Sequence, residues 1–89
     1  MSNLNLIIKI KNKYMNIYKD IDNDSGVSSY NYGSDYIEVE FKDSSVYLYN
    51  YSKPGKQHIE EMKRLANQGD GLNFYITKYV KKNYYSKVR

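Results

Sequence analysis

The chain has 89 residues, a net charge of +4, one histidine and no cysteine. This length suits a single domain, residues 1–89, with one modest hydrophobic core. The lack of cysteine excludes disulfide bonds and cysteine-ligated metals and is compatible with a cytoplasmic location, which we expect, and no apolar run approaches the roughly 18 residues of a membrane-spanning helix.

Residues 1–24 form an N-terminal extension whose secondary structure the pattern leaves open. Leu4, Leu6, Ile8 and Ile10 alternate as in a strand, whereas apolar positions between residues 7 and 21 also fit a helical period. The asparagines and β-branched residues favour a strand or hairpin that turns near residues 12–13.

Three strands of an antiparallel meander are predicted for residues 27–32, 36–42 and 46–51. In the second of them, Ile37, Val39 and Phe41 alternate with charged residues, which is typical of a strand with one buried face. The third strand has two aliphatic side chains on one face and three tyrosines on the other.

Two amphipathic helices are predicted for residues 54–68 and 71–84. Pro54 suits the first turn of a helix, and Asp70 can cap the second helix. We therefore expect an α+β fold, in which a meander of three to five strands is followed by two α-helices packed on one face of the sheet. The sequence leaves open which face is covered. The predicted core consists of Ile37, Val39, Phe41, Met62, Leu65, Leu72, Ile76 and Val80.

Several short motifs follow one another along residues 26–80. They are Val27-Ser28-Ser29, the alternating Ile37, Val39 and Phe41, the pair Tyr47 and Tyr49 with Pro54 nearby, Ala66 near the end of a helix, and Gly69, Asn73 and Ile76 in the spacing Gly-x-x-x-Asn-x-x-Ile. This order resembles the KTSC domain, a small family of bacteria and phages. The resemblance suggests a core of residues 26–84 followed by a basic tail of residues 85–89. It implies a fold but no established activity.

The chain departs from the family pattern at two points. Serine replaces the glycine that is expected in the turn before Tyr47, and Ala66 and Asn73 lie one residue closer than usual.

Nothing in the sequence predicts catalysis, a cofactor or a metal site. His58, the only histidine, lacks a recognisable catalytic partner. The segment from Asp20 to Gly26 resembles the start of a calcium loop, but its glycine comes one position late and Asn31 stands where a glutamate is needed. We interpret it as a solvated acidic turn and expect a non-enzymatic binding module.

Charge is segregated along the chain, which is informative about partners. Residues 20–43 carry seven acids against one lysine, whereas residues 44–89 carry nine cations against three acids. One hypothesis is a small inhibitor or adaptor of the kind that phages or mobile elements carry. It would act on a protein complex that handles nucleic acid, such as a CRISPR effector. Its predicted acidic patch consists of Asp20, Asp22, Asp24, Glu38 and Glu40.

The alternative hypothesis is direct binding of RNA or single-stranded DNA, with tyrosines stacking on bases and lysines neutralising phosphates. The competing structural interpretation is that the tyrosines of residues 47–51 pack beneath the helices. The protein partner is preferred because acids on the meander would repel phosphate where tyrosines are densest. The residues predicted to bind nucleic acid or a partner are Tyr47, Tyr49, Tyr51, Lys78, Lys81, Lys82, Tyr84, Tyr85, Lys87 and Arg89.

Overall fold

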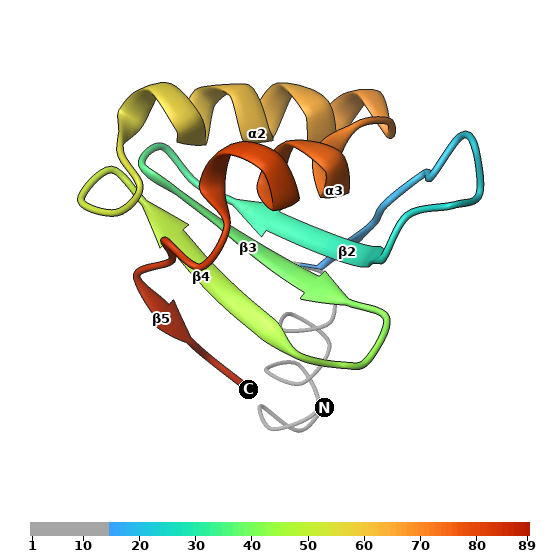
Figure 1. Ribbon diagram of the computed structural model, residues 1–89, viewed down its shortest axis with the longest axis horizontal. Helices are drawn as coiled ribbons and strands as arrows, with labels where there is room; N and C mark the ends of the chain where they lie inside the picture. The colour runs from blue at the N-terminus through green and yellow to red at the C-terminus, as the bar shows by residue number, and fades with distance from the viewer. Residues whose placement is uncertain (1–14) are drawn as a thin grey trace, which may run out of the picture.

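A computed structural model describes residues 15–89 as a five-stranded antiparallel sheet with helices on one side (Figure 1). Along the sheet the strands keep their chain order, β1-β2-β3-β4-β5. The expected α+β meander is therefore confirmed. The elements are β1 (Asn16–Ile17), β2 (Val27–Tyr32), β3 (Tyr36–Phe41), β4 (Val46–Asn50), α2 (Lys56–Gln68), α3 (Leu72–Tyr75), the π-helix η1 (Ile76–Val80) and β5 (Ser86–Lys87).

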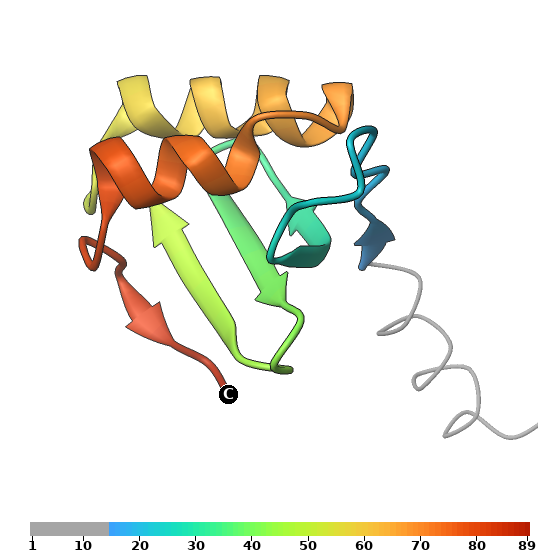
Figure 2. The ribbon, with the colours of Figure 1, turned by 45° about the vertical axis from the view of Figure 1, so that its right-hand side comes forward.

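Both helices cover the sheet face that carries Ile37 and Val39 (Figures 1 and 2). Strand pairing sets Ile37 opposite Tyr49 and Val39 opposite Tyr47. Cross-strand partners project to the same face of a sheet, so these two tyrosines also face the helices. The question that the sequence left open is thereby answered, and the acidic side chains of β3 occupy the opposite face.

The core confirms most of the predicted apolar set. Ile37, Val39, Met62, Leu72, Ile76 and Val80 are buried, while Phe41 and Leu65 pack half-buried against them. The core also contains Tyr18, Val27, Tyr49, Ile59 and Ala66.

Tyr18 closes the core at the edge of the sheet, outside the predicted meander. Its phenol oxygen accepts a hydrogen bond of 3.2 Å from the backbone N–H of Leu72 at the start of α3. Burial raises the pKa of the Tyr18 phenol, which keeps it neutral and suited to this contact. The predictions for residues 1–14 lie outside the described residues, and β1 is the described part of the expected N-terminal extension.

The first helix begins and ends close to the predicted bounds. Gly55, with φ 121°, precedes Lys56, so the helix starts two residues after Pro54. At its other end Gly69 adopts a left-handed conformation with φ 81°, and its N–H donates to the carbonyl of Leu65. Glycine is the favoured residue for this kind of helix end because it has no Cβ.

The second helix is shorter than predicted. The four-residue α3 continues into η1, and the helix ends at Lys81, which has φ 55° and ψ −130°. Beyond it the chain turns back to the sheet, where the N–H of Tyr85 donates to the carbonyl of Leu48 at 2.7 Å. The predicted helix end at residue 84 is therefore wrong, and part of the expected basic tail forms β5 at the sheet edge.

Lys63 on α2 contacts the turn that follows β2 and the turn that follows β4. Its ammonium group donates to the Ser34 carbonyl at 2.7 Å and to the Glu60 carboxylate at 3.0 Å. It also lies 5.6 Å from the ring centroid of Tyr32 and 6.0 Å from that of Tyr51. Only 13% of its side chain remains exposed. Two of the twelve tyrosines thus serve to enclose a lysine.

Candidate functional site

A hollow of about 560 Å³ lies between β4, η1 and the segment that leads into β5. We call it the basic groove. Its aromatic members are Phe41, Tyr47, Tyr49 and Tyr84, its lysines are Lys81, Lys82 and Lys87, and its helical wall contains Asn73, Ile76 and Thr77.

The aromatic rings of the basic groove contact one another. The centroids of Tyr47 and Tyr84 lie 4.7 Å apart, and Phe41 meets Tyr47 edge to face at 5.8 Å. Tyr84 also meets Tyr49 edge to face at 6.5 Å. Because Tyr49 is only 2% exposed, its predicted role as an open stacking ring is wrong. The half-buried rings of Tyr47 and Tyr84 remain for contact with a ligand.

Three lysines line the same hollow as these rings. Strand pairing sets Lys87 directly opposite Tyr47, and the Lys87 ammonium lies 5.8 Å from the centroid of the Tyr47 ring. Lys81 and Lys82 follow η1 and are both exposed. Within residues 15–89, none of these three lysines forms an ion pair with an acid. No described carboxylate therefore lies within ion-pair distance of these lysines.

Lys81 has an unfavourable backbone conformation for a residue with a side chain. The Asn83 N–H donates to the Val80 carbonyl at 3.0 Å, which closes a tight turn with Lys81 at its second position. The angles φ 55° and ψ −130° are those of a type II′ turn, where glycine is favoured. Strain of this kind persists only where the surrounding structure imposes it, and it clusters at functional sites.

The remaining predicted binding residues lie outside the basic groove. The Tyr51 phenol donates to Glu60 at 2.6 Å, and Arg89 forms an ion pair of 2.8 Å with Glu40. Lys78 lies beside the exposed rings of Phe74 and Tyr79, 5.5 and 5.7 Å from their centroids. Tyr85 is exposed and does not line the basic groove.

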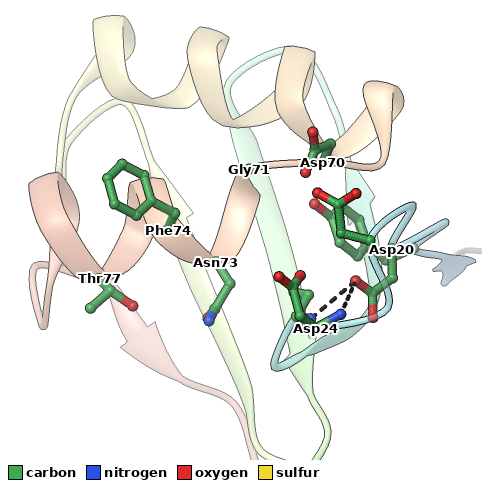
Figure 3. A pocket seen from close by; sticks show the side chains of 10 residues that line it. Asp20, Asp24, Asp70, Gly71, Asn73, Phe74 and Thr77 are labelled. Carbon is green, nitrogen blue, oxygen red and sulfur yellow. Dashed lines mark hydrogen bonds between the residues drawn. The ribbon is translucent and has the colours of Figure 1, made fainter.

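A second hollow of about 330 Å³ lies on the other side of α3. We call it the acidic hollow, and its acids are Asp20, Asp22, Asp24 and Asp70. Figure 3 shows Asp20 and Asp24 on the loop before β2 and Asp70 on the connection between α2 and α3.

The loop of the acidic hollow is a turn held by hydrogen bonds from its own backbone to the Asp20 carboxylate. One Asp20 oxygen accepts the N–H groups of Asp24 and Ser25 at 3.2 and 3.0 Å, and the other accepts Lys42 at 3.2 Å. Partial desolvation acts to raise the pKa of Asp20, but these hydrogen bonds outweigh it and hold the pKa below its usual value. The carboxylate of Asp20 is thus engaged in holding its own loop.

The predicted acidic patch is divided between two regions. Asp20, Asp22 and Asp24 line the acidic hollow, whereas Glu38 and Glu40 face a separate hollow beside Arg89. The prediction of one five-residue patch is wrong because alternation along β3 directs its acids away from the helices.

Among residues 15–89, no three histidine or carboxylate side chains converge in a way that could hold a metal ion.

Four residues of the basic groove were not predicted as binding residues, namely Phe41, Asn73, Ile76 and Thr77. Asn73 and Thr77 line its helical wall together with Phe41 from the sheet. Asn73 and Thr77 are four residues apart and therefore share one helix side, a spacing that is readable in the sequence once the covered sheet face is known.

No helix in the described part of the chain is long and apolar enough to cross a membrane.

Comparisons of the chain with family models, curated proteins and solved structures gave no match. The resemblance to the KTSC domain therefore stays a prediction.

Proposed function

We propose that the protein is a non-enzymatic module that binds single-stranded nucleic acid in the basic groove. One observation carries the proposal: two half-buried tyrosine rings and three lysines line the same hollow. Proteins that bind single strands combine aromatic rings, on which bases stack, with a basic surface that follows the phosphates.

The charge distribution supports the preference for nucleic acid over a protein partner. The sequence favoured a protein because acids of the meander would repel phosphate near the tyrosines. However, Tyr47 faces the helices, whereas Glu38 and Glu40 line a hollow on the other sheet face. That objection therefore does not apply to the basic groove.

Fluorescence anisotropy with labelled single-stranded RNA and DNA tests the proposal. The variant Lys82→Gln/Lys87→Gln should weaken binding and flatten the log–log salt dependence by about 1.4, because each phosphate contact to a single strand contributes about 0.7. The control is Lys53→Gln/Lys56→Gln, which removes the same charge from exposed positions outside the basic groove. Binding weaker than about 10⁻⁴ M for every oligonucleotide would contradict the proposal.

A second candidate function is binding to a protein complex that handles nucleic acid, for example as an inhibitor of a CRISPR effector. The observation that favours it is that four aspartates line one hollow, which would suit a basic protein surface. Capture of a partner should then survive nuclease treatment and should weaken on charge reversal of Asp20, Asp22 and Asp24. Capture that is lost on nuclease treatment would contradict this candidate.

A further inference from the structure

The basic groove and the acidic hollow are separated by a single helical wall. Asn73 and Thr77 line both cavities, and Figure 3 shows the two side chains on the helix that borders the acidic hollow. A strand that left the basic groove over this wall would bring its next phosphate toward four aspartates. At 0.1 M salt, charges act over about 10 Å, so this exit disfavours a continuing strand.

The size of the basic groove also favours a short ligand. Its volume of about 560 Å³ lies within the range of roughly 300–1,000 Å³ that is typical of pockets for one small molecule. A groove that followed a strand over many nucleotides would need a longer continuous surface.

The lysines of the groove provide more positive charge than one internal phosphate requires. A phosphate monoester carries a charge of about −1.5 to −2 at neutral pH, whereas an internal diester carries only one negative charge. Lys81 and Lys82 are adjacent in one turn, and Lys87 lies opposite the Tyr47 ring. Lys81, whose backbone is strained, lines the basic groove together with the other two lysines.

We propose that the basic groove recognises a nucleoside phosphate monoester, which is either the phosphorylated end of a single strand or a free mononucleotide. Lys81, Lys82 and Lys87 contact the phosphate, and Tyr47 and Tyr84 contact the base. The acidic hollow acts as a boundary that prevents the strand from continuing across the wall. This inference rests on the proposed function.

Binding of matched oligonucleotides tests the recognition of a phosphate monoester separately from the proposed binding of single strands. Labelled strands of one sequence would carry a 5′-phosphate, a 3′-phosphate or no terminal phosphate, and a fourth would be closed into a circle. A phosphorylated strand should bind about tenfold more tightly than the unphosphorylated one, as expected for additional hydrogen bonds to a charged group, and the circle should bind most weakly. Equal binding of all four would overturn this inference and leave the proposed function intact, whereas no binding of any would overturn both.

A variant of the boundary tests the role of the acidic hollow. Asp22→Asn/Asp24→Asn/Asp70→Asn leaves every residue of the basic groove in place and should raise the affinity for the circle more than for the phosphorylated strand. A parallel increase for both would show only a change in overall charge and would contradict the boundary. The far-ultraviolet circular dichroism of the variant checks that the fold is retained.

Competition distinguishes the two sources of the monoester. Displacement of the phosphorylated strand by adenosine monophosphate at a similar concentration would identify a mononucleotide site, and displacement only by phosphorylated strands would identify a strand-end site. Inorganic phosphate that competes as well as adenosine monophosphate and every strand would contradict recognition of the nucleoside.

Discussion

The basic groove and the acidic hollow border the same helix, but their charged side chains have different tasks. In the acidic hollow, Asp20 is occupied by two backbone N–H groups and by Lys42. In the basic groove, Lys81, Lys82 and Lys87 have no acidic partner within residues 15–89. Equal clustering of charge therefore does not imply equal availability, because part of the acidic charge stabilises a loop while the lysines have no ion-pair partner among the described residues.

The largest expected effect comes from the wall that both cavities share. Ile76 is 5% exposed and is the residue of this wall that belongs to the hydrophobic core. Ile76→Ala should lower the free energy of unfolding by about 2–5 kcal/mol, since truncation of a buried isoleucine loses apolar contacts and leaves a cavity. Chemical denaturation measures this change. A loss below 1 kcal/mol would show that the wall does not depend on this packing.

Charge reversal in the groove should have the next largest effect. Lys82→Glu/Lys87→Glu replaces attraction to phosphate by repulsion and should weaken oligonucleotide binding by about 100-fold at low salt. The matched control Lys53→Glu/Lys56→Glu changes the net charge equally and should reduce binding much less. Similar losses in both variants would mean that net charge, and not the basic groove, governs binding. Anisotropy at several salt concentrations supplies the measurement.

Substitution of Tyr18 should affect only the side of the helix that borders the acidic hollow. Tyr18→Phe removes the acceptor for the Leu72 N–H and should destabilise the protein by about 1–3 kcal/mol, the cost of an unsatisfied buried donor. Oligonucleotide affinity should stay unchanged below the unfolding transition, because Tyr18 does not line the basic groove. A parallel loss of affinity would indicate that the two sides of the wall are coupled.

Relief of backbone strain should separate stability from binding. Lys81→Gly removes the Cβ from a position with φ 55° and should stabilise the fold by about 1 kcal/mol, which corresponds to a rise in Tm of about 4–8 °C for a domain of this size. The same variant should bind oligonucleotides more weakly because one lysine is lost. A variant that is more stable and binds equally well would remove Lys81 from the site.

The smallest effect at neutral pH is expected for Tyr49, a buried residue that lines the basic groove. Burial raises the pKa of Tyr49 above its usual value of 10.0, so the phenol stays neutral in the folded state where it would ionise in the unfolded chain. Its contribution to stability is complete below pH 10 and is lost as the pH rises further. Tyr49→Phe should therefore show a shallower fall in Tm between pH 9 and 11. An identical slope in both proteins would assign the alkaline effect to other tyrosines.

The sequence predicted the fold well because local and tertiary preferences agree. Alternation of Ile37, Val39 and Phe41 specified a strand with one buried face, and Gly69 marked the end of α2. In contrast, the end of the second helix could not be read from its pattern. Apolar spacing continued past Val80, but the turn at Lys81 is set by pairing of the following segment with β4.

The candidate site was predicted only in part because its composition also depends on tertiary packing. Six predicted residues meet in the basic groove, but the sequence could not show which sheet face the helices cover. That choice decides whether Tyr49 is a ligand contact or a core residue, and whether Glu38 lies beside the tyrosines or behind them. Long-range packing, not local period, fixes both outcomes.

The enclosure of Lys63 gives the protein an internal reference for chemical reactivity. Its amine is held by Ser34 and Glu60 and is shielded by two rings, so an acylating reagent should modify it slowly with or without ligand. Lys82 and Lys87 are exposed and should react quickly unless a ligand covers them. Mass spectrometry of the labelled protein would thus compare a protected amine with exposed ones in a single sample, and the ratio would report occupancy of the groove without any substitution.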